Sequence, residues 1–166
     1  ENCDITHLTG LENLTYINED FILDFNESLS GLSGLEGLTT IGGRFYIGIN
    51  DSLTGFTGLN ALSSIGNDLY IDGNSLITNM SGLENLISIG GSINIEDNNN
   101  LISLTGLEGV IILGSDIIIT GNPLLKSLSG LENIEPSSII NLTVHDNDSL
   151  SFCEVGNLCS YLFSPN

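Results

Sequence analysis

Aromatic and acidic side chains at a constant spacing are the residues of this chain best suited to binding a ligand. Tyr46 and Tyr70 stand 24 residues apart, and Asp68 and Asp72 lie two residues before and after the second tyrosine. A tyrosine ring offers a large apolar surface with a polar tip, and carboxylates accept hydrogen bonds. Such groups suit a sugar ring or the side chains of a protein partner, provided that the fold places the two tyrosines side by side.

A repeat of the same length predicts that placement. Glycine followed by leucine recurs every 24 residues, at Gly10, Gly34, Gly58, Gly82, Gly106 and Gly130. The sixth repeat needs one extra residue near Pro136 to keep its later positions in phase. A constant period of this length indicates one structural unit stacked on copies of itself.

The middle of each repeat has the pattern of a β-strand. Phe21-Ile22-Leu23 and Leu69-Tyr70-Ile71 alternate between inward and outward positions, and turn residues such as Gly42-Gly43 precede these segments. No run with a 3.6-residue period reaches the length of a helix. We therefore predict an all-β fold, a parallel β-solenoid of about six coils of 24 residues with its aliphatic side chains pointing to the axis.

Asparagine recurs at the corner that follows each middle strand. The predicted structural ladder consists of Asn26, Asn50, Asn74, Asn98, Asn122 and Asn147. Stacked asparagines can bond to one another and to the backbone of a buried turn. Asn2 occupies the same slot, so the chain begins partway through a coil, and we expect it to be a fragment of a longer protein with further domains or subunits at the open first coil.

The outward residues of the middle strands form one continuous face. Because adjacent strands lie about 4.8 Å apart, Tyr46 and Tyr70 should stack, with Ile22 beside them. The predicted ligand-binding residues are Ile22, Arg44, Tyr46, Asp68, Tyr70, Asp72 and Asn94. The alternative is that these cross-strand pairs only stabilise the sheet, by about 0.2–1 kcal/mol each.

Groups for catalysis are scarce. The sequence has two basic residues, Arg44 and Lys126, which fall on different coils, and two histidines, His7 and His145, at opposite ends of the stack. A lyase on a β-helix needs a basic residue beside clustered carboxylates, and a triad or dyad needs its histidine within hydrogen-bond reach of its partners. We predict that the protein is not an enzyme.

The net charge of −19 argues against nucleic acid and anionic membranes as partners, because both require a cationic face. No apolar run is long enough to span a membrane. The acidic residues near the corners could bind Ca²⁺ loosely, but no calcium-loop spacing, zinc motif or other metal site is present, and we predict no cofactor.

The repeat domain is predicted to cover residues 1–152, and residues 153–166 break its phase and form a short C-terminal cap. Cys153 and Cys159 are close enough to form a disulfide if this segment turns back, which would leave Cys3 either free or paired elsewhere. Disulfides would place the chain outside the cytoplasm.

The repeated phrase GLENLTxIGG, with leucine, isoleucine and asparagine at fixed later positions, resembles the receptor L domains of the insulin and epidermal growth factor receptors. It is more closely similar to the L-domain-like leucine-rich repeats of secreted and surface proteins of Bacteroidetes, in which a CxxxxxCxYL stretch like Cys153 to Leu162 often closes the array. The resemblance implies a right-handed β-helix exported to the cell surface. It carries no ligand-contacting residue over, because nothing here matches the receptors position by position.

Asp-Ser-Leu triplets resemble the O-glycosylation acceptors of exported Bacteroidetes proteins and would place sugar on Ser52 and Ser149. We predict an extracellular recognition or adhesion module that binds a protein or glycan. The first alternative is a structural spacer in a larger surface assembly. A distant third is ice binding by the hydroxyl columns that begin at Thr15, which Tyr16 and several isoleucines interrupt.

Overall fold

The computed structural model describes residues 5–151, 155, 156 and 158. The predicted disulfide between Cys153 and Cys159, the first cysteine (Cys3), Asn2 and most of the predicted cap lie outside the described residues.

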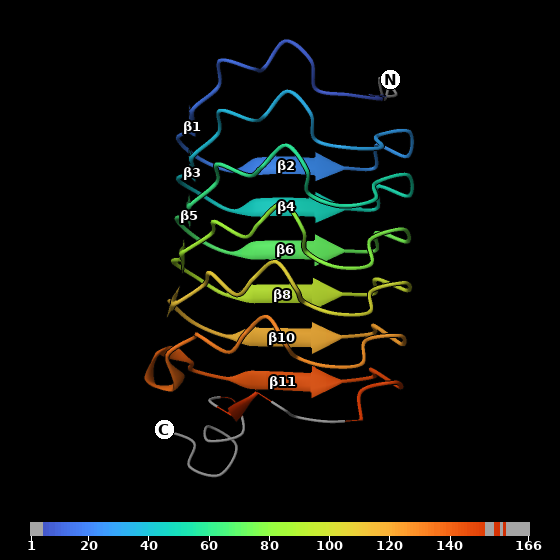
Figure 1. Ribbon diagram of the computed structural model, residues 1–166, viewed down its shortest axis with the longest axis vertical. Helices are drawn as coiled ribbons and strands as arrows, with labels where there is room; N and C mark the ends of the chain where they lie inside the picture. The colour runs from blue at the N-terminus through green and yellow to red at the C-terminus, as the bar shows by residue number, and fades with distance from the viewer. Residues whose placement is uncertain (1–4, 152–154, 157, 159–166) are drawn as a thin grey trace.

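The described chain winds into a parallel β-solenoid with two sheets (Figure 1). The six-stranded sheet contains β2 (Phe21–Asp24), β4 (Phe45–Gly48), β6 (Leu69–Asp72), β8 (Ile93–Glu96), β10 (Ile117–Thr120) and β11 (Leu142–His145). The five-stranded sheet contains β1 (Tyr16–Ile17), β3 (Thr40–Ile41), β5 (Ser64–Ile65), β7 (Ser88–Ile89) and β9 (Ile112–Leu113). The predicted all-β parallel fold is confirmed, with about five complete turns in place of the six expected.

The register between coils follows the repeat. Phe21 pairs with Phe45, a shift of 24, whereas Ile117 pairs with Leu142, a shift of 25. The extra residue falls where a 3₁₀ turn, η1 (Pro136–Ser138), replaces the next short strand, as the phase of the sequence predicted. Proline has no N–H to donate to a neighbouring strand, so the five-stranded sheet ends at β9.

The core is a continuous column of aliphatic and aromatic side chains along the axis. Phe45, Ile47, Leu69 and Ile71 point inward from neighbouring strands and are all 0% exposed. Phe21 stacks on Phe45 with ring centroids 5.5 Å apart. Since the alternate residues of each strand point outward, the register that buries this core also determines which side chains share the outer face.

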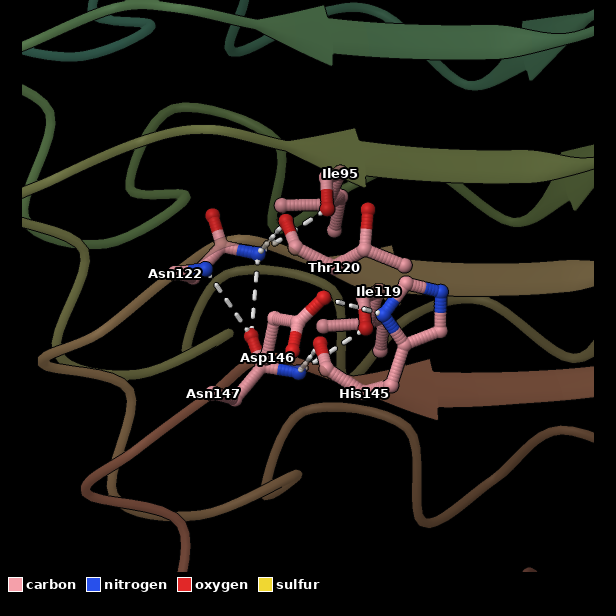
Figure 2. Close-up of polar contacts among 7 residues, drawn as sticks. All are labelled: Ile95, Ile119, Thr120, Asn122, His145, Asp146 and Asn147. Carbon is pink, nitrogen blue, oxygen red and sulfur yellow. Dashed lines mark hydrogen bonds and ion pairs between the residues drawn. The ribbon is translucent and has the colours of Figure 1, made fainter.

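The corner asparagines bond in a directional ladder (Figure 2). Oδ1 of Asn122 accepts the backbone N–H of Asn98 at 3.1 Å, and its Nδ2 donates to the carbonyl of Ile95 at 3.0 Å and of Thr120 at 2.8 Å. Oδ1 of Asn147 accepts the N–H of Asn122 in the same way, at 3.0 Å. Each side chain therefore satisfies backbone groups of two coils at a bend that would otherwise leave them unpaired.

A second set of side chains caps the turn at the start of each repeat. The N–H of Gly106 donates to Glu108 at 2.7 Å, and the N–H of Gly130 donates to Glu132 at the same distance. Gly58 has a φ of +113°, and a Cβ at that position would lie 2.2 Å from the carbonyl oxygen of Leu32 on the preceding coil. The repeated glycine is thus required by both backbone conformation and close packing.

Candidate functional site

The structure places the two predicted tyrosines on neighbouring strands. Tyr46 on β4 pairs with Tyr70 on β6, and Ile22 on β2 pairs with Tyr46. The ring centroids of this tyrosine pair are 6.0 Å apart, with their planes tilted by 45°. Both rings are half-buried, whereas Ile22 is 49% exposed. These three side chains form an apolar and aromatic strip on the outer face, which is the solvent-facing side of the six-stranded sheet.

Tyr46 lies along its strand instead of standing upright from the sheet. A Cβ on residue 48 would be 2.4 Å from Cε1 and 2.5 Å from the hydroxyl oxygen of Tyr46, so the ring occupies the space above Gly48. Its hydroxyl donates a long hydrogen bond of 3.5 Å to Oδ2 of Asp72. Among the strands of the described chain, Gly48 is the one glycine. Its missing side chain allows the ring to lie down.

A cation of the chain itself lies at the other end of Tyr46. Nη2 of Arg44 is 3.3 Å from Oδ2 of Asp20, and the guanidinium carbon is 5.9 Å from the centroid of the Tyr46 ring. The backbone N–H of Arg44 also donates to Oδ1 of Asp20 at 2.7 Å. This arrangement combines an exposed ion pair with a cation–π contact.

Carboxylates crowd the hydroxyl end of Tyr46. Gly48 pairs with Asp24 on one side and with Asp72 on the other, so the two acids flank the space that the ring fills. Partial burial raises the pKa of Asp72, and the negative charges of Asp97 and Asp24 raise it further. Burial, followed by the charges of Asp24 and Asp72, likewise raises the pKa of the Tyr46 hydroxyl.

The same crowding extends to the next strand. Burial raises the pKa of Glu96, and the charges of Asp72 and Asp97 add to the effect. These directions indicate partly buried carboxylates crowded by like charge, although His145 lowers the pKa of Glu96 in part.

The described chain leaves three buried side-chain polar atoms without a hydrogen-bond partner, and all three belong to this region: Oδ1 of Asp24, Nε of Arg44 and Nδ2 of Asn94. Asn94 is 2% exposed and lies in the outward column between Tyr70 and Ile118. Most buried polar groups in proteins have a partner, so the coincidence of these atoms with the tyrosine pair marks the region as unlike the remainder of the solenoid.

Asp68, another predicted binding residue, has a role within the fold. Its Oδ1 accepts the backbone N–H of Ser92 at 2.8 Å, just before β8 begins. Asp116 accepts the N–H of Asn141 in the same manner, at 3.0 Å. The structure therefore brings Ile22, Arg44, Tyr46, Tyr70, Asp72 and Asn94 together around one strip, with Asp68 holding the start of a strand beside it.

A left-handed corner beside the site was not predicted. The residue after each middle strand has positive φ at Phe25, Ile49, Gly73, Asp97, Gly121 and Asp146. Ile49 is notable because a β-branched residue seldom adopts this conformation, and its φ is +49°. The glycine and aspartate residues of this column are the sequence signal for the left-handed conformation, which the asparagine ladder alone does not predict. Phe25, 53% exposed, adds an aromatic side chain to the rim next to Asp24.

The remaining predicted groups lie elsewhere. Ser52 and Ser149 are half-buried on a different side of the coil, where the N–H of Ser149 donates to the carbonyl of Pro123 at 3.0 Å. In the hydroxyl column just before the strands of the five-stranded sheet, Thr39 donates to the carbonyl of Thr15 at 2.9 Å, and Ser63 to that of Thr39 at 3.1 Å. These hydroxyls bond to the preceding coil and so contribute to stacking.

Within the residues that the structure describes, no three or more histidine, cysteine, aspartate or glutamate side chains are arranged to hold a metal ion. The acidic residues near the corners therefore do not form such a cluster for the loosely bound Ca²⁺ that the sequence suggests. Nδ1 of His145 and Oδ2 of Asp146 form an exposed hydrogen bond of 2.8 Å (Figure 2). The described part of the chain also contains no helix with the length and apolar character needed to cross a membrane.

Comparisons with protein-family models, with curated proteins and with solved structures found no match to this chain. The similarity to receptor L domains therefore stays a prediction from the sequence.

Proposed function

We propose that this protein is a non-catalytic recognition module that captures a partner on the outer face, at the tyrosine pair. The observation that carries the proposal is the position of Tyr46, laid over Gly48 beside Tyr70 and between acidic columns. The resemblance to L-domain repeats and the charge of −19 are in keeping with an extracellular or cell-surface protein whose partners are neither nucleic acid nor anionic membranes.

Gly48 favours binding over simple sheet stabilisation. Gly48 is the last residue of β4, and glycine within a strand lowers stability because it loses more chain entropy on folding and offers no side chain to pack. The other five residues of this column all have side chains: Asp24, Asp72, Glu96, Thr120 and His145. The local loss is accompanied by an aromatic ring laid flat on the sheet, which is a geometry suited to stacking against a ligand.

The test is capture of partners from protein and glycan arrays by the wild type and by a Tyr46→Ala, Tyr70→Ala double variant. An Ile118→Ala, Thr143→Ala variant is the matched control, because these residues belong to the same outward column on β10 and β11. We expect capture to be lost in the tyrosine variant and retained in the control, with parallel-sheet circular dichroism unchanged in both. Full retention by the tyrosine variant would instead favour the structural spacer.

A further inference from the structure

The two ends of the Tyr46 ring differ in their charge balance. At the end near the start of β4, Arg44 balances Asp20 through an ion pair of 3.3 Å. At the hydroxyl end, Asp24 and Asp72 flank the ring, and neither carboxylate has an ion pair with a basic group in the described chain. The other basic residue, Lys126, lies outside both sheets, where its backbone N–H bonds to Ile102. Carboxylates therefore lie at both ends of the Tyr46 ring, but only those at the Arg44 end are paired with a basic side chain.

The unpaired polar atoms around the ring are of both kinds. Oδ1 of Asp24 is an acceptor, whereas Nδ2 of Asn94 and Nε of Arg44 are donors. A ligand that satisfies all three must supply hydrogen-bond donors as well as an acceptor oxygen. A metal ion or a polyamine supplies no such oxygen, and a neutral sugar supplies no charge for the carboxylates.

We propose that the outer face binds a polypeptide segment that carries arginine or lysine, with its cationic group over the hydroxyl end of Tyr46, beside Asp24 and Asp72. The backbone carbonyls of the same segment accept hydrogen bonds from Asn94. This inference rests on the proposed recognition function and names the chemical class of its partner.

Geometry and charge favour this occupant. Asp24 and Asp72 lie on strands two spacings apart, about 9.6 Å, with the Tyr46 ring over Gly48 between them, so a guanidinium or ammonium group would rest on the solvent side of the ring's hydroxyl end, beside both carboxylates. An extended segment advances about 3.3 Å per residue, so three or four residues reach from Gly48 to Asn94 across two strands. Access to the buried amide requires a neighbouring side chain to change rotamer, which is common at interfaces. The net charge of −19 also attracts a basic partner over long range.

The experiment measures binding of an oligo-arginine peptide, a neutral oligo-glutamine peptide of equal length and a neutral glycan array at about 0.15 M salt. The protein is tested as wild type, as Asp24→Asn with Asp72→Asn, and as the tyrosine double variant. The control is Glu135→Gln with Asp148→Asn, which removes the same charge from the sixth repeat, several coils from the tyrosine pair.

We expect the arginine peptide to bind and the glutamine peptide not to bind. Changing Asp24 and Asp72 should weaken binding at least about tenfold more than the control pair does. An equal loss in the two pairs would overturn the inference, because binding would then depend on net charge alone. Tyrosine-dependent capture of a neutral glycan, without capture of the arginine peptide, would also overturn it while the proposed function stands. If the tyrosine variant captures partners as well as the wild type does, both this inference and the proposed function are wrong.

Discussion

The asparagine corner and the outer face are built from the same repeat, yet they use it in opposite ways. In the corner, every coil contributes the same residue, and each inner asparagine bonds to the backbone of its own coil and of the preceding one. On the outer face, the equivalent positions vary from coil to coil, and the buried unpaired atoms of the described chain belong to this region. In this solenoid, the buried polar groups are hydrogen-bonded where every coil has the same residue, and some are left unpaired where the residue changes from coil to coil.

This contrast has a physical basis. A stacked repeat is stabilised when each coil offers its neighbour the same complementary groups, because every interface is then equally good. A ligand, in contrast, needs a particular set of side chains at one place, which a uniform column cannot provide. The glycine at position 48 and the tyrosines at 46 and 70 break the pattern of their columns at adjacent strands, and that local break identifies the candidate site.

The largest effect is expected from the corner. Asn74→Ala removes bonds from Nδ2 to the carbonyls of Ile47 and Asp72, both 2.9 Å, and the bond that Oδ1 accepts from the N–H of Asn50 at 3.1 Å. Because these groups are buried and lose their partners, we expect the free energy of unfolding to fall by about 3 kcal/mol or more. Urea unfolding followed by circular dichroism measures the change.

The control for this variant is Asn85→Ala, which removes one exposed bond of 2.7 Å to the carbonyl of Asn60. We expect it to lower stability by less than about 1 kcal/mol. Equal losses at the two sites would mean that the corner contributes no more than an ordinary surface contact, and the contrast with the outer face would disappear.

A smaller effect on stability but a larger effect on binding is expected at Gly48. Gly48→Val places a Cβ where the Tyr46 ring lies, 2.4 Å from its nearest atom, so the ring must move away from the sheet. We expect unfolding free energy to change by about 1 kcal/mol or less, because valine suits a strand, and partner capture to fall by about tenfold. Thr120→Val in the same column is the control and should leave capture unchanged, as measured by the same binding assay.

The periodic features could be predicted from the sequence because they recur in successive repeats, and the inserted residue near Pro136 stands out as the departure from that period. Strand positions, the parallel register, the inserted residue near Pro136 and the stacking of Asn50 on Asn74 all follow from the repeat. The orientation of Tyr46 occurs once and depends on the absence of a side chain two residues away. Alternation specifies only that the ring points outward, so its resting position above Gly48 could not be deduced. The left-handed corner was missed because Phe25 and Ile49 are residue types that rarely adopt it.

That corner gives a moderate effect in the stabilising direction. Ile49→Gly relieves a conformation that costs a β-branched residue about 1–2 kcal/mol, although glycine loses more entropy on folding and some packing disappears. We expect a net gain of about 0.5 kcal/mol, measured as a higher urea midpoint. Gly121→Ala, at the equivalent corner with φ of +67°, should move the midpoint in the opposite direction. A loss of stability in Ile49→Gly would indicate that packing of this side chain outweighs the backbone strain.

The smallest effect concerns the pH dependence of the acidic columns. Because the pKa values of Asp72 and Glu96 are raised in the folded protein, both carboxyls bind protons more tightly when folded. They therefore oppose folding fully above their raised pKa values, and this opposition fades as pH falls toward the ordinary values of 3.8 and 4.5. Acidification through that window should stabilise the wild type relative to an Asp72→Asn, Glu96→Gln variant.

The measurement is the difference between the two melting temperatures at a series of pH values, with carboxyl chemical shifts recorded by NMR to follow each titration. The control is the Glu135→Gln, Asp148→Asn pair, which removes the same number of charges from the sixth repeat, away from Asp72 and Glu96. If the two pairs behave alike, the carboxylates around Tyr46 repel one another no more than those of any exposed surface. The outer face would then not differ electrostatically from the rest of the solenoid. If only the first pair responds, a cationic partner gains affinity from the same repulsion that it relieves.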